Sequence, residues 1–171
     1  MDDPTSLQTN GAPDKEAGVQ HDDKLELRVW LRLLTCATMI EREVRGRLRR
    51  DFEITLPRFD VLAQLDRAAD GLTMGELSGR LMVSNGNITG LIDRLVAEGL
   101  VIRAAKPGDR RSVHVRLTDK GKQAFDAMTP AHEAWIDEML AGLSRREMAD
   151  LYELLARLKS SAAPAEMETG D

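Results

Sequence analysis

The sequence predicts a mainly α-helical chain that carries one small β-hairpin. Apolar residues recur at i, i+3 and i+4 over most of its length, which is the period of an amphipathic helix. Aromatic residues make up only 4% of the composition, and Leu, Ala, Arg and Glu are abundant. One pair of alternating segments, 101–105 and 112–117, flanks a Pro-Gly-Asp turn. At 171 residues the chain is long enough for one domain with its own core.

The N-terminal part combines a polar arm with a long helix. Residues 1–22 are rich in Asp, Gly, Pro, Thr and Gln, and without an apolar period they are expected to be disordered. A helix is predicted from Asp23 to about Arg50. Its apolar stripe at i+4 spacing, expected to be buried, consists of Cys36, Ile40, Val44 and Leu48.

Three shorter helices are predicted next, and each has a start signal. Pro57 suits a first helical turn, Thr73 and Glu76 have the spacing of a capping box, and Ser84 is a suitable N-cap. The predicted ranges are 57–69, 73–80 and 84–99, and the hairpin follows them directly. Helix, turn, helix and basic hairpin in this order is the layout of a winged helix-turn-helix.

The C-terminal part is predicted to be helical over 119–140 and 144–160, with a frayed tail over 161–171. Together with the helix over 23–50, these helices carry longer apolar stripes than a small reading head over 57–118 can cover. We therefore expect the domain over 23–160 to form a homodimer through its first and last helices.

The net charge of −5 argues by itself against a nucleic-acid partner, but the charge is unevenly placed. The acidic excess lies in the tails, because residues 1–24 hold six acidic side chains and residues 161–171 hold three. Between these tails 22 basic and 20 acidic side chains remain. The segment 101–118 has five basic side chains against Asp109 alone, and phosphate binding depends on this local field.

The helix over 84–99 has one face suited to base edges. Ile88, Leu91, Ile92 and Leu95 fall on its predicted buried face. The opposite face carries two glycines, each costing about 1 kcal/mol relative to alanine, so a close approach by another surface is the expected reason for them. Alternatively, Gly86 belongs to a loose first turn and Gly90 is tolerated without a role. The residues predicted to contact DNA from this helix and its neighbour are Arg80, Ser84, Asn85, Gly86, Asn87, Thr89, Gly90 and Arg94.

The hairpin tip offers a second set of DNA contacts. Asp109 can orient the guanidinium of Arg111 so that it enters a narrow minor groove, and Arg110 is placed for a phosphate. The plain alternative is a solvated charged turn. For Arg94 the alternative is an ordinary ion pair with Glu98 at i,i+4.

The chain resembles the MarR family of bacterial transcription regulators over roughly residues 25–160. The family's wing pattern Asp-x-Arg-x-x-x-Val-x-Leu-Thr is present as Asp109, Arg111, Val115, Leu117 and Thr118. The resemblance implies a homodimeric, sequence-specific DNA-binding regulator, usually a repressor, on a pseudo-palindromic operator. It also implies release of the DNA by a small ligand. The text over 56–60 and 84–89 is similar to branches that control aromatic-acid breakdown.

An anionic aromatic ligand, or its thioester, needs an arginine and an aromatic wall. Each candidate taken singly is more readily explained by packing or by a surface position. The candidates are Trp30, Cys36, Arg58, Asp60, His132 and Trp135.

Other classes of function receive little support from the sequence. It has no Gly-rich phosphate loop, no metal-ligand spacing and no nucleophile elbow, so neither an enzyme nor a cofactor is expected. No run approaches the ~18 apolar residues of a membrane span. The single cysteine, Cys36, suits a reducing cytoplasm. Two alternatives remain open: redox sensing through Cys36, and a wing that binds another protein.

Overall fold

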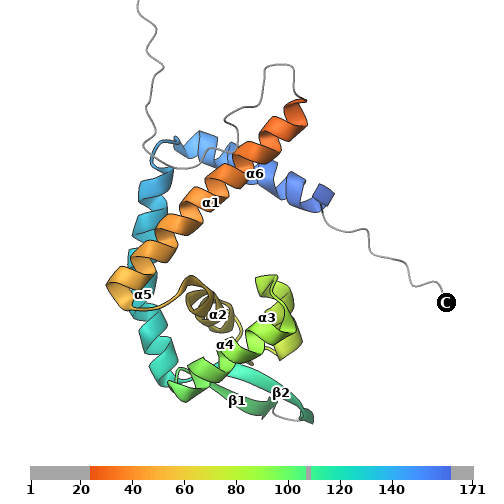
Figure 1. Cartoon of the computed structure of the whole chain (residues 1–171), viewed down its shortest axis with the longest axis vertical. Helices are drawn as coiled ribbons and strands as arrows, with labels where there is room; N and C mark the ends of the chain where they lie inside the picture. Colours follow the sequence, from red (N-terminus) through yellow and green to blue (C-terminus); the bar gives the residue numbers. More distant parts are fainter. Residues whose placement is uncertain (1–23, 107–108, 163–171) are drawn as a thin grey trace, which may run out of the picture. The chain divides into compact units, whose positions relative to one another are not determined.

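The computed structural model describes residues 24–106 and 109–162, with the backbone alone described for Asn85, Lys106 and residues 109–112. The predicted arm over 1–22 and the tail beyond 162 lie outside the described residues. Six helices and one antiparallel two-stranded sheet are present in the described part, so the predicted fold class is confirmed (Figure 1). In chain order they are α1 Leu25–Phe52, α2 Leu56–Asp66, α3 Met74–Leu81, α4 Asn85–Ala97, β1 Val101–Lys106, β2 Asp109–Leu117, α5 Asp119–Leu140 and α6 Arg145–Ala162.

The described chain divides into two compact units, one ending at Glu133 and the other beginning at Ala134. In the first unit, α2, α3 and α4 pack on one another and on the β1–β2 hairpin (Figure 1). Burying their apolar faces together supplies most of the favourable free energy of this small core. The side chains with the least exposure are Leu48, Val61, Leu62, Leu77, Ile88, Ile92, Leu95, Val101 and Val115.

The start signals predicted for α2, α3 and α4 are confirmed, with Pro57 in the first turn of α2. Thr73 and Glu76 form a capping box at α3, and Ser84 Oγ accepts from the Asn87 amide at α4. At α6, the Ser144 amide donates to the Glu147 carboxylate over 2.8 Å, and the Glu147 amide donates to Ser144 Oγ. These bonds satisfy amide groups that a helix leaves without intrahelical partners.

The predicted end of α2 at residue 69 is wrong, because the helix ends at Asp66. A turn follows it, in which the Gly71 amide donates to the Ala68 carbonyl over 2.8 Å. Gly71 has a φ of +78°, and an added Cβ would lie 2.5 Å from the Val115 carbonyl oxygen. The turn therefore needs glycine.

The wing is larger than predicted at both strands. β1 continues to Lys106 and β2 begins at Asp109, so residues 109–111 belong to a strand rather than to the tip. The register is regular from Val101 opposite Leu117 to Ala105 opposite Val113, with an irregularity beyond it. Leu72 adds a bridge to Val115 through two backbone hydrogen bonds of 3.0 and 2.7 Å. This bridge ties the start of the helix-turn-helix to the wing.

α6, which belongs to the second unit, has an apolar face with no buried residue. The leucines of this face are between 39% and 58% exposed in the single chain. The helix runs to Ala162, two residues into the predicted tail. The exposed leucines are Leu151, Leu154, Leu155 and Leu158.

Among the described residues, no helix combines the length and the hydropathy that crossing a bilayer requires.

Candidate nucleic-acid interface

The α4 helix has the two faces that the sequence predicts. Ile88, Ile92 and Leu95 have no exposed surface and anchor the helix to the core. Leu91, predicted on the same face, is only half-buried. All described residues of the predicted reading face, including the N-cap, are exposed. They are Ser84, Gly86, Asn87, Thr89, Gly90, Asp93 and Arg94.

The two glycines of this face have no role in the packing of the chain itself. A Cβ built on Gly86 or Gly90 meets no atom within 4 Å. Both positions have helical backbone and belong to α4, so neither is required by a turn. An alanine at either site is therefore compatible with the fold, and the open strip along α4 is available to an external surface.

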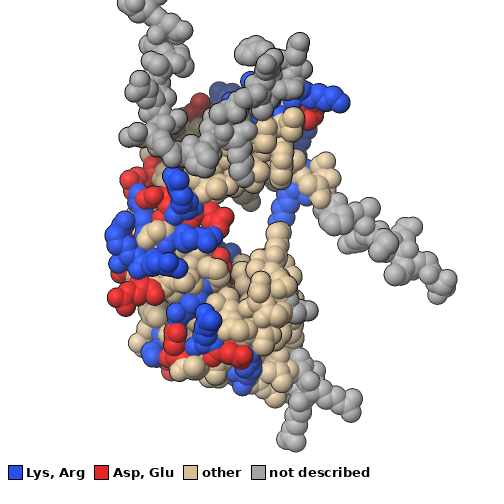
Figure 2. Space-filling model, in the orientation of Figure 1, with Lys and Arg blue, Asp and Glu red and all other residues tan. Residues whose placement is uncertain are grey.

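An open groove of about 580 Å³ lies between α1, the start of α2 and the exposed face of α4. Arginines contribute its polar rim, and α4 contributes the open glycines. Figure 2 shows basic side chains, interspersed with acidic ones, gathered over the C-terminal half of α1. The groove residues that matter here are Arg45, Arg49, Gly86, Asn87, Gly90 and Arg94.

One carboxylate on α4 is neutralised by the wing. The Nη2 atom of Arg103 on β1 lies 2.7 Å from Oδ1 of Asp93, in an ion pair between exposed side chains. This pair, which the sequence did not predict, removes an uncompensated negative charge beside the reading face. Arg80 is exposed in the last turn of α3.

The wing contacts stay predictions. Only the backbone of Asp109, Arg110 and Arg111 is described, so the oriented Asp109–Arg111 pair lies outside the described side chains. The backbone places these residues at the start of β2, next to the tip of the hairpin.

Glu98 pairs with a different arginine from the one considered in the sequence. The guanidinium of Arg58 on α2 donates to the Glu98 carboxylate. The alternative ion pair between Arg94 and Glu98 is therefore wrong for this structure. The cause is the packing of α2 against α4, which brings together residues 40 positions apart.

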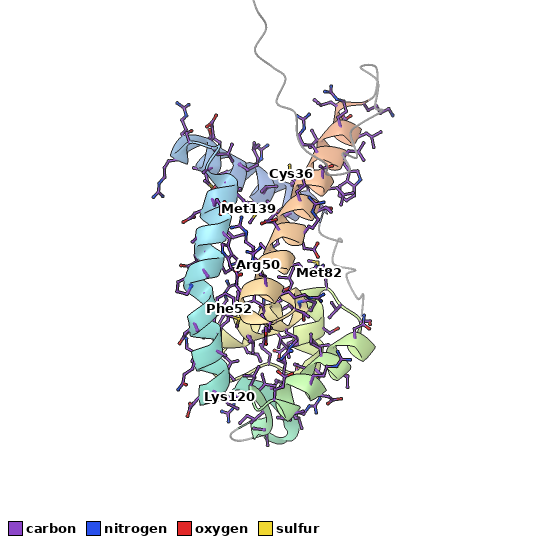
Figure 3. The ribbon with its side chains drawn as sticks, turned by 60° about the vertical axis from the view of Figure 1, so that its left-hand side comes forward. Cys36, Arg50, Phe52, Met82, Lys120 and Met139 are labelled. Atoms are coloured by element: carbon purple, nitrogen blue, oxygen red, sulfur yellow. The ribbon has the colours of Figure 1, made fainter. Side chains whose placement is uncertain are left out.

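The C-terminal end of α4 is joined to the start of α5. Thr118 Oγ1 donates to the Gly99 carbonyl over 2.7 Å, and Lys120 Nζ donates to the Glu98 carbonyl over 2.8 Å. Gly121 packs so closely that an added Cβ would lie 1.9 Å from the Leu100 carbonyl oxygen. Lys120 lies in the first turn of α5, at the lower end of this helix in Figure 3.

The predicted ligand residues do not form one cluster. Trp30 is 55% exposed on α1, and Cys36 is exposed on the part of α1 that extends beyond the reading head (Figure 3). The prediction that Cys36 is buried is wrong for the single chain, because only Val44 and Leu48 of its stripe reach the core.

The other four candidates lie on α2 and α5. His132 stacks against the core residue Phe59 with ring centroids 4.7 Å apart, and burial lowers the pKa of its imidazole. Trp135 belongs to the second unit. Arg58 and Asp60 lie on α2, and Arg58 is engaged with Glu98.

Asp60 is half-buried, and burial raises the pKa of its carboxyl to about 6. Glu41 raises the pKa further and Arg45 opposes the rise. The folded protein therefore holds this proton more tightly than the unfolded chain does. Between about pH 4 and pH 6 the free energy of unfolding contributed by Asp60 falls as the pH rises.

Asp60→Asn is expected to remove this pH dependence. A neutral amide avoids the cost of the buried charge, and solvent screening of a half-buried group reduces that cost. The variant should therefore gain about 1–2 kcal/mol of stability over the wild type between pH 4 and pH 7. Urea unfolding of both proteins across this pH range measures the difference. A stability difference that stays constant with pH would contradict it.

A helix-turn-helix with a polar exposed face on its second helix, followed by a hairpin, defines the class of winged helix-turn-helix proteins. The MarR family model matches residues 54–113. Transcriptional activatory protein BadR from Rhodopseudomonas palustris is 31% identical over 142 residues, covering 80% of this chain and 81% of BadR. YkoM of Bacillus subtilis is 38% identical over 82 residues, 48% of this chain and only about half (53%) of YkoM.

Two solved structures extend the comparison to the whole fold. A MarR family transcriptional regulator from Silicibacter pomeroyi is 33% identical with a TM-score of 0.68, covering 81% of this chain and 95% of that one. A mutant of MarR from E. coli, complexed with operator DNA, is 30% identical with a TM-score of 0.67, covering 80% of this chain and 99% of that one. The chain belongs to the MarR family of transcriptional regulators. Its relatives are regulators and not enzymes.

Proposed function

We propose that this regulator is a homodimeric repressor that binds a pseudo-palindromic operator in double-stranded DNA and is released by a small aromatic carboxylate or its thioester. The observation that carries the DNA-binding part is the open face of α4. It presents Asn87 and Thr89 beside two glycines that the fold does not need. E. coli MarR, a relative at 30% identity, has been solved with operator DNA.

The homodimer is supported by apolar surface that the single chain leaves exposed. Leu151, Leu154 and Leu155 lie on such a face of α6, and Trp30 is exposed on α1. A surface of this kind favours association with a second copy. Two recognition helices in a symmetric dimer then meet major grooves about one helical turn apart.

The proposed ligand requires a cation and an aromatic wall. Asp60, His132 and the aromatic ring of Phe59 lie on α2 and α5, but the Arg58 cation is held by Glu98. BadR is named as an activator, so activation is the alternative to repression.

Selection of bound duplexes from a random library, followed by titration at several salt concentrations, tests the proposal. We expect a pseudo-palindromic consensus and an affinity that falls steeply with salt. No binding at low salt would refute the DNA-binding function and favour a wing that binds protein. Adding aromatic acids tests release, and peroxide with a Cys36→Ser control tests the redox alternative.

Arg111→Ala is expected to weaken binding to every duplex. An arginine in the minor groove contributes mainly through charge. The slope of log affinity against log salt concentration (the salt slope) should therefore become shallower by about 1 for each wing. Fluorescence anisotropy on the selected duplex and on a scrambled one measures both quantities. A loss confined to the selected duplex would instead assign Arg111 to base recognition.

A further inference from the structure

Glu98 is the C-cap residue of α4 and stands one turn after Arg94. Two arginines can therefore compete for its carboxylate, Arg94 from the same helix and Arg58 from α2. In the structure Arg58 holds it through one terminal nitrogen. Arg94 makes no ion pair with any described residue and lines the open groove beside Gly90.

The outcome of this competition has a physical cause. A cation that precedes the anion by four residues is the weaker order for a helical pair. Arg58 is the less exposed of the two arginines, with 19% of its side chain accessible, and attraction between charges is stronger where water is partly excluded. Its Nε is buried without a hydrogen-bond partner among the described residues, so the bond to Glu98 provides its main polar contact.

Arg58 and Arg94 also act on each other directly. Burial lowers the pKa of Arg58, and the positive charge of Arg94 lowers it further, so the two guanidinium groups are close enough to repel. The repulsion favours a conformation in which Arg58 points to Glu98 and Arg94 points outward.

The geometry points to Arg58 as a positioning residue for DNA binding: by holding Glu98, it keeps the Arg94 guanidinium available for a DNA phosphate. This inference rests on the proposed function. Arg58 itself does not need to touch DNA. Its loss would let Glu98 capture Arg94 at the edge of the reading face.

Five variants test the inference: Arg58→Met, Arg94→Ala, Glu98→Gln and the double variants Arg58→Met/Glu98→Gln and Arg58→Met/Arg94→Ala. The probe is a mixed-sequence duplex of about 30 base pairs, because a phosphate contact does not depend on sequence. Arg58→Met and Arg94→Ala should each lower affinity roughly three- to tenfold and reduce the salt slope by about 0.9 per recognition helix. The double variant Arg58→Met/Arg94→Ala should bind DNA no more weakly than either single variant.

The double variant Arg58→Met/Glu98→Gln decides between positioning and simple stabilisation. If Glu98 captures Arg94 once Arg58 is gone, removing its charge should restore the salt slope. Arg50→Met is the matched control for the lost charge, because Arg50 lies on α1 and is paired with Asp51. This variant should keep the wild-type salt slope. Thermal unfolding of each variant monitors the fold.

An unchanged slope in Arg58→Met would overturn the inference, as would a double variant that stays as weak as Arg58→Met. Both results require wild-type protein that binds DNA with a steep salt slope. Wild-type protein that does not bind the duplex at low salt would instead refute the proposed function, and the inference with it.

Discussion

Gly90→Ala is expected to make the protein more stable and a weaker DNA binder. The fold has open space at this position, so the added methyl group should raise the free energy of unfolding by up to about 1 kcal/mol through helix propensity. The same methyl group would occupy the strip of α4 that is proposed to contact DNA. Overpacking of a close contact costs about 1–3 kcal/mol. The affinity for DNA should therefore fall roughly ten- to a hundredfold for each α4 helix that contacts DNA.

Urea unfolding and DNA titration of the same preparation measure the two effects. Gly46→Ala is the control, because Gly46 is a helical glycine of α1 with equally open space and lies outside α3, α4 and the wing. It should share the gain in stability and keep the affinity for DNA. A Gly90→Ala protein with wild-type affinity would show that DNA does not approach this strip.

Gly121→Ala is expected to have the largest effect on stability. The new Cβ would lie 1.9 Å from the Leu100 carbonyl oxygen and 2.9 Å from its carbon, and both are backbone atoms that cannot rotate away. The start of α5 must therefore separate from the end of α4. We expect a loss of about 3 kcal/mol or more, despite the helix propensity of alanine.

Gly79→Ala, at an open position in α3, is the control for this variant and should be neutral or stabilising. Circular dichroism during thermal unfolding gives the comparison. A Gly121→Ala protein as stable as Gly79→Ala would mean that α4 and α5 tolerate separation, and that the close contact is not needed by the fold.

Local patterns in the sequence predict the helices well because each signal acts over one turn. Thr73 with Glu76, and Ser144 with Glu147, are the caps in the structure. The apolar period of α4 likewise predicts the burial of Ile88 and Ile92. These features depend only on residues three or four positions apart.

The parts that sequence reasoning misses depend on distant residues. Arg58 and Glu98 are 40 positions apart, and the sequence by itself offers Arg94, four positions from Glu98, as the partner of that carboxylate. Leu72 pairs with Val115 of β2 as a single residue. One residue shows no alternation of apolar and polar side chains, so the sequence pattern does not predict this bridge. Gly121 is an ordinary glycine in a first helical turn until the Leu100 carbonyl is placed against it.

The joint between α4 and α5 has a mechanical consequence. Thr118 and Lys120 donate to the last carbonyls of the α4 segment, and Gly121 leaves no gap between the two backbones. Bending at this joint would break several short contacts at once. The end of α4 and the first turn of α5 are therefore expected to move together as one rigid unit. A displacement of the start of α5 would therefore also move α4, whose exposed face is the proposed contact with DNA.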